Sequence, residues 1–486
     1  MTRITAGNFI THRLPVFALT VLLLSSCLQE QPNGIEGTGG VGTPPPTSPS
    51  ITFLSPDCVP RGEQQLNPNT NGDLSVVGQN FQANSVVRWN GSDLPTTFFS
   101  STQLTAKVSA TDTATVGSAA VTVFTPGAGG GSSNAATITI DAGAVFPNSI
   151  AIDPAGQFAY VADEGCGNST FGYVSMYSID AITGSLTSIG PPVLTNDEGA
   201  TSVAVSPAGT FIYVANWGAG DTAGSLSAYT INPTSGALAY TATIQAPCEL
   251  SPGSCAPWSV IVDPSGKFAY VANEGGFVPT SVSVYTINAT TGALTLIGGS
   301  AAAGRANSVA VDPTGKFVYL TNNQGDSVSM YTIDTTTGVL TPKGTIAAGS
   351  SPTALAIDRS GKFAYVTNSN SNDVSMYTIN ATTGALTSLG LMATGTAPAS
   401  MAMDPSGKFA YVTNSGSNDV SMYTINASTG TLLSIGTIAA GLLPSSIAIQ
   451  PAGKFAYVTN SVSNSVSIYS IDVATGALTL IGTIGT

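Results

Sequence analysis

The stretch that decides the fold is "GKFAYVTNSNSNDVSMYTINATTGALTSLG", which runs from Gly361 to Gly390. A near copy, "GKFAYVTNSGSNDVSMYTINASTGTLLSIG", runs from Gly407 to Gly436. The shorter pattern Gly-x-Phe-x-Tyr-[Val/Leu] occurs seven times, with its glycine at positions 156, 209, 266, 315, 361, 407 and 453. Internal similarity at a period of about 20–50 residues indicates a repeat architecture.

Each copy contains four short β-strand patterns in order, separated by turn signals. Around Gly361 they are an apolar segment before the glycine and then "KFAYVTN", "VSMYTI" and "ALTSLG". Phe363 and Tyr365 share one face of their strand, and Ala364 and Val366 share the other. A strand that is apolar on both faces is packed on both sides. Seven such units without helices between them predict an all-β fold, with a closed seven-bladed β-propeller over residues 145–486.

The turn that opens each copy combines glycine with charged residues. We expect its glycine to adopt a positive φ angle, and Asp312 to hydrogen-bond the backbone of its own turn near Lys316. Lysines recur in these turns, at positions 267, 316, 362, 408 and 454. They form either a solvated rim that keeps strand edges soluble or a weak anion-binding surface, and we favour the first.

Composition excludes several classes of function. The 486 residues are 42% hydrophobic and only 8% charged, and the formal net charge of -13 excludes a nucleic-acid partner. His12 is the only histidine. If the leader described next is removed, no imidazole is left for Ser-His-Asp catalysis, haem ligation or a histidine metal site. We expect no cofactor and no metal. Ca²⁺ in the Asp/Asn loops is the alternative, but these residues are more often turn formers.

The first residues have the pattern of a secretory leader. Arg3 and Arg13 precede the apolar run Leu14–Leu24, which is too short to span a bilayer. The run ends in "LSSC", which resembles a bacterial lipobox with Cys27 as the lipidated residue; an ordinary signal with a chance cysteine is the alternative. We therefore predict a signal peptide over 1–26 and a Gly/Pro/Ser/Thr-rich tether over 27–50. The resemblance implies a lipid-anchored protein of the cell envelope, at the outer membrane or cell surface.

Residues 51–140 consist of short alternating strands and turns, which indicates a small β-sandwich. The strings "LSVVGQNF", "SVVRWNG" and "SNAATITI" occur in an order that resembles the immunoglobulin-like IPT/TIG domains. Such domains act as spacers or binding modules. We expect Trp89 to be a core residue.

The repeats are recognisable as well. "FAYVTN", "VSMYTI" and "TTGALT" resemble the YVTN-repeat propellers, relatives of the seven-bladed lactonase-like family. The resemblance covers residues 145–486 and implies the fold more strongly than any chemistry, because one fold hosts many functions.

Of the remaining four cysteines, Cys58 and Cys166 have no basic neighbour in sequence that would activate a thiolate. Cys248 and Cys255 flank the short loop "ELSPGS" and are predicted to form a local disulfide. Cys58 and Cys166 are either structural thiols or a long-range pair.

Function is expected where the repeat symmetry breaks, on the rim opposite the lysines. The candidate binding residues there are Asp163, Glu164, Asp197, Glu198, Trp217, Trp258, Glu274 and Arg305, accompanied by Cys166 and Asp221. Glu274 lies in a loop of blade three and Arg305 in the crossover that leaves it, so we expect the two to be neighbours. Only Tyr173 and Tyr240 fall outside the repeated tyrosine positions, so an aromatic carbohydrate platform is poorly supplied by tyrosine.

Two functions remain open. The first is a non-catalytic envelope protein, expected to be a monomer, that binds a protein or polymer through the asymmetric rim. The alternative is a lactonase-like hydrolase of the 6-phosphogluconolactonase type. The resemblance implies a site of His, Arg and Glu, but the histidine is missing and no catalytic residue can be carried over. A carboxylate base with Arg305 as oxyanion stabiliser is conceivable, which makes Arg305, Glu274 and Glu164 the candidates.

Overall fold

The computed structural model describes most of the chain from residue 48 onward. The described ranges are 48–55, 58–60, 74–109, 111–114, 117–127, 130–141, 146–165, 171–218, 224–246, 256–274, 282–300, 302 and 304–486. The predicted signal peptide, Cys27, nearly all of the tether, Cys166, Asp221, Cys248 and Cys255 lie outside them. Within these ranges the only helical element is the short 3₁₀ turn Asn323–Gly325. No helix found in them is long and apolar enough to cross a membrane.

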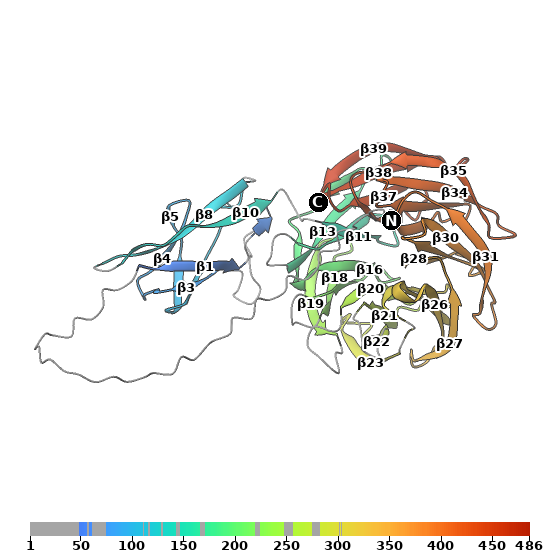
Figure 1. The fold of residues 1–486 in the computed structure, drawn as a ribbon, viewed down its shortest axis with the longest axis horizontal. Coiled ribbons are helices and arrows are strands. Elements are labelled where there is room, and N and C mark those ends of the chain that lie inside the picture. The colour runs from blue at the N-terminus through green and yellow to red at the C-terminus, as the bar shows by residue number, and fades with distance from the viewer. Residues whose placement is uncertain are drawn as a thin grey trace, which may run out of the picture. The chain divides into compact units, whose positions relative to one another are not determined.

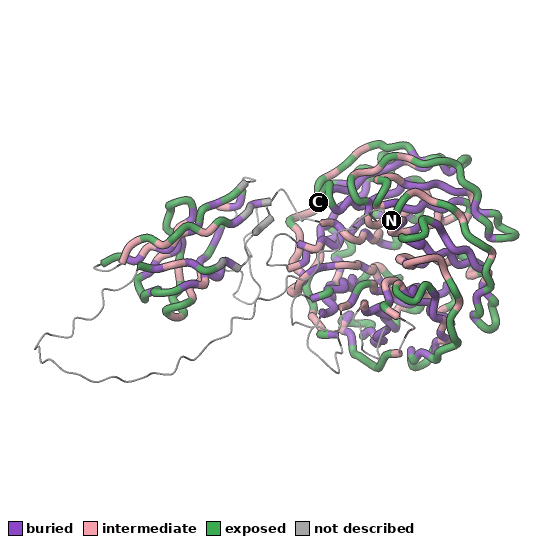
Figure 2. Tube along the Cα trace, in the orientation of Figure 1, coloured by how far each residue is buried: buried purple, intermediate pink, exposed green. Residues whose placement is uncertain are grey.

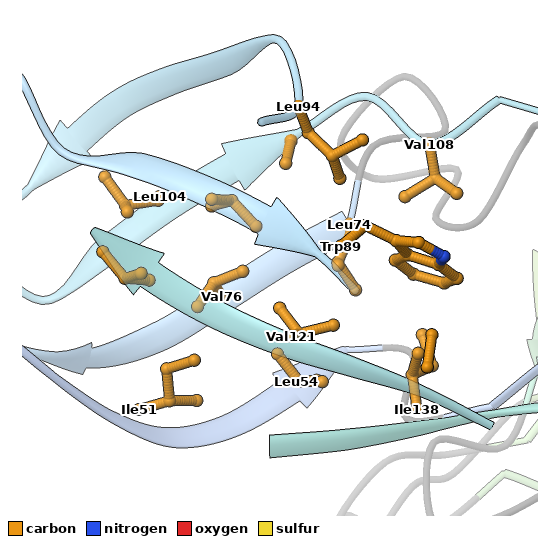
Figure 3. Packing of buried hydrophobic residues seen from close by; sticks show 14 of the residues in the cluster. Ile51, Leu54, Leu74, Val76, Trp89, Leu94, Leu104, Val108, Val121 and Ile138 are labelled. Carbon is orange, nitrogen blue, oxygen red and sulfur yellow. The ribbon is translucent and has the colours of Figure 1, made fainter. Parts of the chain in front are cut away.

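The N-terminal part consists of two β-sheets whose strands are mostly antiparallel. Its strands are β1 (Ser50–Ser55), β2 (Cys58–Pro60), β3 (Leu74–Gln79), β4 (Val86–Trp89), β5 (Ser92–Asp93), β6 (Thr96–Ser100), β7 (Gln103–Ala106), β8 (Gly117–Thr125), β9 (Gly131–Ser132) and β10 (Ala136–Asp141). One sheet has the order β1-β3-β7-β6, and the other has β2-β10-β8-β4-β5 with β9 paired to β8. Both sheets contribute to one core, which includes Leu74, Leu104, Val121 and Ile138 (Figure 3). Trp89 is 4% exposed within it, so its predicted core role is confirmed.

Seven further sheets follow one another along the chain (Figure 1). Blade one contains β11 (Pro147–Ile152), β12 (Phe158–Asp163), β13 (Phe171–Ile179), β14 (Leu186–Ser188) and β15 (Val193–Glu198). Blade two contains β16 (Ala200–Val205), β17 (Phe211–Asn216), β18 (Ser225–Ile231) and β19 (Leu238–Gln245). Blade three contains β20 (Pro257–Val262), β21 (Phe268–Asn273), β22 (Val282–Ile287) and β23 (Leu294–Ser300). Blade four contains β24 (Ala306–Val311), β25 (Phe317–Asn322), β26 (Ser327–Ile333) and β27 (Leu340–Ala347).

The last three blades are the most regular. Blade five contains β28 (Pro352–Ile357), β29 (Phe363–Asn368), β30 (Asp373–Ile379) and β31 (Leu386–Ala393). Blade six contains β32 (Pro398–Met403), β33 (Phe409–Asn414), β34 (Asp419–Ile425) and β35 (Leu432–Ala439). Blade seven contains β36 (Pro444–Ile449), β37 (Phe455–Asn460), β38 (Ser465–Ile471) and β39 (Leu478–Gly485). Second strands are buried throughout, whereas outer strands are largely exposed (Figure 2).

The opening hairpins of five blades are stabilised by an aspartate of their own turn, as predicted for Asp312, whereas blades two and seven carry Ser206 and Gln450 at this position. Asp312 Oδ1 accepts hydrogen bonds from the backbone N–H groups of Lys316 and Phe317, both at 2.7 Å. The turn glycine is left-handed in every blade; Gly361, for example, has φ of +69°. A residue with a Cβ is disfavoured in that conformation, which explains why the glycine recurs.

The two faces of each second strand pack against different neighbours. In blade five, Phe363 and Tyr365 pack with blade six, while Ala364 and Val366 pack with blade four. Large side chains of one blade therefore meet small side chains of the next, and both faces are apolar because both are interfaces.

A specific contact joins each blade to the following one. The Phe363 ring lies against Gly430 in the next blade, so close that a Cβ on Gly430 would be 2.2 Å from the ring. The Tyr365 hydroxyl donates a hydrogen bond of 2.8 Å to the Gly430 carbonyl oxygen. The same Phe–Tyr–Gly contact occurs at all seven interfaces, with glycines 184, 236, 292, 338, 384, 430 and 476.

The ring closes by the same contact between blades seven and one. The Tyr457 hydroxyl donates to the Gly184 carbonyl at 3.0 Å, and the innermost strand β11 lies beside both β16 and β36. The described strands of blade seven all lie between Pro444 and Gly485. Closure therefore involves side chains and not an exchanged strand, as the four-in-order pattern of the copies predicted.

Replacing Gly430 by alanine should lower the free energy of unfolding by at least about 2 kcal/mol, because the new methyl group overlaps the Phe363 ring. Gly407→Ala is the matched control. Gly407 has φ of +71°, close to the +74° of Gly430, but nothing lies within 4 Å of a Cβ placed there. Chemical denaturation measures both variants, and equal losses of stability would show that the aromatic contact is not what requires the glycine.

Candidate functional site

One backbone hydrogen bond recurs in all seven blades and defines a ring of equivalent positions. The residue after each second strand donates its N–H to the carbonyl of the residue before the innermost strand, with lengths of 2.8–3.2 Å. We call the seven donor residues the crossover ring: Glu164, Trp217, Glu274, Asn323, Ser369, Ser415 and Ser461. The face of the propeller that carries them is the crossover face, opposite the lysine-bearing hairpins.

The crossover ring divides into two arcs of different chemistry. In blades five to seven it consists of serines whose hydroxyl groups donate to nearby backbone carbonyls, at 3.1 Å for Ser369 and 2.9 Å for Ser415 and Ser461. These hydroxyls serve the local fold. In blades one to four the same positions hold two carboxylates, an indole and an amide, which the repeat geometry does not require. Any chemistry specific to this face is therefore concentrated in blades one to four.

Glu274 and Arg305 form an ion pair on this face. Arg305 Nη1 lies 3.6 Å from Glu274 Oε1, so the structure brings together the two residues that sequence placed as neighbours. The Arg305 side chain remains 43% exposed and the Glu274 side chain 27% exposed. A pair with this exposure contributes at most about 1 kcal/mol to stability. Both charges are consequently accessible to a ligand and are not required to hold the ring together.

Trp258 occupies the second position of the innermost strand β20 and is 38% exposed. In four other blades the equivalent side chain donates to the first residue of the next innermost strand; these are Asn148, Thr201, Thr353 and Ser445. Trp258 replaces such a polar link by an exposed indole. In the next blade, Asn307 Oδ1 is buried without a hydrogen-bond partner among the described residues. The link pattern is thus broken beside the ion pair.

Trp217 is the crossover-ring residue of blade two and is 40% exposed. A Cβ on Gly199 would lie 1.9 Å from Trp217 Cδ1, which means that the indole lies directly on this glycine. A Cβ on Gly224 would lie 2.4 Å from Pro257 Cδ and 2.6 Å from the Trp217 carbonyl oxygen. The backbones carrying Trp217 and Trp258 therefore converge beside Gly224.

Asp163 breaks a second symmetry. It ends the second strand of blade one, where the other six blades have a buried asparagine. Its Oδ2 accepts a 2.7 Å hydrogen bond from Ser175 Oγ, and its Oδ1 has no partner among the described residues. Complete burial raises the pKa of Asp163 from 3.8 to about 8, although the bond from Ser175 lowers it. Asp163 is therefore protonated at neutral pH and is not an exposed binding residue.

The other predicted acidic residues lie in the crossover into blade two. Burial raises the pKa of Asp197, whose Oδ1 accepts the Glu198 N–H at 2.8 Å. Glu198 also pairs with Phe171 of β13, because β15 adds to blade one as an extra strand. Glu164 joins the crossover ring through its N–H. No three His, Cys, Asp or Glu side chains are grouped as metal ligands in the described part of the chain.

Sequence reasoning missed Asn323 and Asn307. The signal for Asn323 was available: it directly follows "FVYLTN", as Glu274 follows "FAYVAN" and Ser369 follows "FAYVTN". Alignment of the residue after each second strand would have found the whole crossover ring. Asn307 had no comparable signal, because the partner contacts of innermost strands depend on how adjacent blades meet.

Comparison with known proteins identifies the family. The family model "Lactonase, 7-bladed beta-propeller" matches residues 187–311, 299–403 and 390–484. The chain belongs to this family. No curated protein matches it.

Several solved structures share the fold of this lactonase-family protein. A Bacteroides uniformis protein, provisionally assigned as a 6-phosphogluconolactonase, is 22% identical with a TM-score of 0.58 over 66% of this chain and 94% of its own. A Bacteroides fragilis protein with the same provisional assignment is 23% identical, with a TM-score of 0.59 over 68% and 94%. The periplasmic gluconolactonase of Pseudomonas aeruginosa is 21% identical, with a TM-score of 0.58 over 65% and 93%. At these identities the similarity shows the fold alone.

Asp163→Asn should make stability less dependent on pH. Between pH of about 4 and about 8 the unfolded state has lost a proton that folded Asp163 keeps, so rising pH destabilises the parent protein by up to about 1.4 kcal/mol per pH unit relative to the variant. The variant's advantage should grow through this window and level off above it. Urea denaturation from pH 4.5 to 9 measures the difference.

The control is Asn216→Asp, which places a buried carboxyl at the equivalent position of blade two. This variant should lose more stability than the parent as the pH rises, because it has two buried carboxyl groups in place of one. A difference between Asp163→Asn and the parent that stays constant across the range would contradict the burial of a protonated carboxyl.

Proposed function

We propose that the crossover face hydrolyses a lactone, with Glu274 and Arg305 as the acting residues. The observation that carries this proposal is their accessible ion pair, located in the arc of the crossover ring that departs from the repeat. Membership of the lactonase family supports it, as does the assignment of similar folds as 6-phosphogluconolactonases and a gluconolactonase.

The reaction needs a base for water and a positive charge for the oxygen that becomes negative. Water attacks the lactone carbonyl carbon while the Glu274 carboxylate accepts one of its protons. The Arg305 guanidinium stabilises the negative charge that develops on the carbonyl oxygen. The ring C–O bond then breaks and the leaving oxygen receives the proton from Glu274, so that lactone and water give a hydroxy acid. No imidazole is required in this scheme, which matters because His12 is the only histidine.

A second candidate is a binding protein without catalysis, whose partner is a protein or a polymer. The observation in its favour is the absence of histidine from the propeller sequence. The family resemblance implies a histidine in the site on this rim. Under this proposal the same accessible side chains recognise a partner and no bond is broken.

The rest of the chain fits a role outside the cytoplasm. We place residues 51–140 as an immunoglobulin-like spacer between a lipid anchor on Cys27 and the propeller. The two-sheet core around Trp89 supports a separately packed N-terminal domain. The local disulfide that the sequence predicts between Cys248 and Cys255 would form in an oxidising envelope.

Lactone hydrolysis is tested with full-length protein and a panel of sugar and aliphatic lactones near pH 7. Arg305→Ser and Glu274→Ser introduce the residue that blade five carries at the equivalent positions, Ser351 and Ser369. Each should lower kcat/KM by about 10²-fold or more. Arg359→Ala, on the opposite hairpins, is the matched control and should keep full activity. Turnover no faster than the spontaneous rate with every lactone would leave the binding candidate as the better one.

Lipidation is tested by Cys27→Ser with cell fractionation. The variant should move from the membrane fraction to the soluble fraction, because the acyl chains proposed on Cys27 would be missing. Cys248→Ser serves as the control and should stay with the membrane. Equal membrane retention of Cys27→Ser and the parent would refute the anchor.

A further inference from the structure

Two of the three tryptophans are exposed on neighbouring blades at the crossover face. Trp217 and Trp258 are 40% and 38% exposed, whereas Trp89 is buried in the N-terminal core. Their backbones converge at Gly224, on neighbouring blades two and three. Exposed indoles leave a large apolar surface in water, which is costly unless a ligand covers it.

The repeat does not need either indole. The crossover-ring position of Trp217 holds serine in blades five to seven, and the position of Trp258 holds a small or polar residue in every other blade, including Thr201 and Ala399. Trp217 is nevertheless held in place. Its backbone N–H donates to the Gly199 carbonyl oxygen at 3.0 Å, and its indole ring lies on that glycine. A rigid aromatic surface binds with little loss of side-chain entropy.

The polar groups around the indoles suit hydroxyl groups. Glu274 offers carboxylate oxygens as acceptors, and Arg305 offers a guanidinium donor fork. Asn323 belongs to the same arc of the crossover ring. Flat apolar platforms combined with amide, carboxylate and guanidinium groups match a pyranose ring, which has an apolar face and an equatorial belt of hydroxyls.

The charge of this face disfavours a phosphorylated ligand. Arg305 is accompanied by Glu164, Glu198 and Glu274 on the crossover face. The other basic residues of the propeller lie on the opening hairpins or on the outer strand β27; they are Lys267, Lys316, Lys343, Arg359, Lys362, Lys408 and Lys454. Because Arg305 is already paired with Glu274 and the other charges named on this face are carboxylates, a phosphate dianion would find little net attraction there.

We propose that Trp217 and Trp258, together with the Glu274–Arg305 pair, form a binding site for an uncharged saccharide. The indoles stack on its pyranose rings, and the polar side chains hydrogen-bond its hydroxyl groups. Saccharide binding as such does not depend on catalysis. The corollary that the lactone substrate is an unphosphorylated sugar lactone rests on the proposed function.

Isothermal titration calorimetry of the full-length protein with glucose, maltose and cellobiose tests the site. Binding of at least one of these sugars is expected. Trp217→Ser and Trp258→Thr should each weaken it by about 3- to 10-fold, and the double variant should abolish it. Both substitutions introduce residues that other blades of the propeller already carry at the equivalent positions. Thermal melting confirms that the variants are folded. Tyr240→Ser removes an exposed aromatic from the outer strand β19 and should leave affinity unchanged.

Three outcomes overturn the proposal: no binding of any of the three sugars by folded parent protein, unchanged affinity in the double tryptophan variant, or tighter binding of glucose 6-phosphate or choline than of glucose. Lactone turnover is measured separately. Sugar binding without turnover supports the saccharide site and contradicts the hydrolase, whereas turnover of aliphatic lactones without sugar binding does the reverse.

Discussion

The contact on which the structure depends is the Phe–Tyr–Gly contact between consecutive blades. Phe363 lies on Gly430 and Tyr365 donates to its carbonyl, and the same three groups meet at every interface, including the closing one. A blade has no core of its own, since each of its faces is completed by a neighbour. Repeating one complementary contact seven times is therefore both the origin of the sequence repeat and the condition for closing the ring.

This requirement restricts where the protein can vary. Aromatic residues of second strands, turn glycines and the aspartates of opening hairpins are all engaged in holding blades together. The crossover ring is less constrained, because its position is set by a backbone hydrogen bond that every residue except proline can make. Glu164, Trp217 and Glu274 can thus differ from Ser369 without disturbing the fold. The lactonase family fold offers this face as a surface on which chemistry can change independently of stability.

The asymmetric arc combines features that point to one kind of ligand. Its ion pair is too exposed to contribute much stability, its indoles are too exposed to be core residues, and its acidic character contrasts with the lysine-bearing hairpins. Under the two proposals above, Glu274 and Arg305 serve both lactone hydrolysis and the hydrogen bonding of a neutral sugar, and the indoles supply flat apolar platforms for the sugar ring. Asp163 stands apart, because its complete burial keeps it protonated and out of contact with solvent.

The sequence by itself determined the propeller. The period, the two-residue alternation of Phe363 and Tyr365, the turn glycines and the order of strands are local or repeated features, so they could be read without coordinates. It also placed Glu274 near Arg305, because neighbouring blades put a loop and the next crossover together. Tertiary structure alone decided that Asp163 is buried and neutral, and that Trp217 and Trp258 are exposed on backbone segments that converge. Burial and adjacency depend on how blades meet across long sequence distances, which no local pattern records.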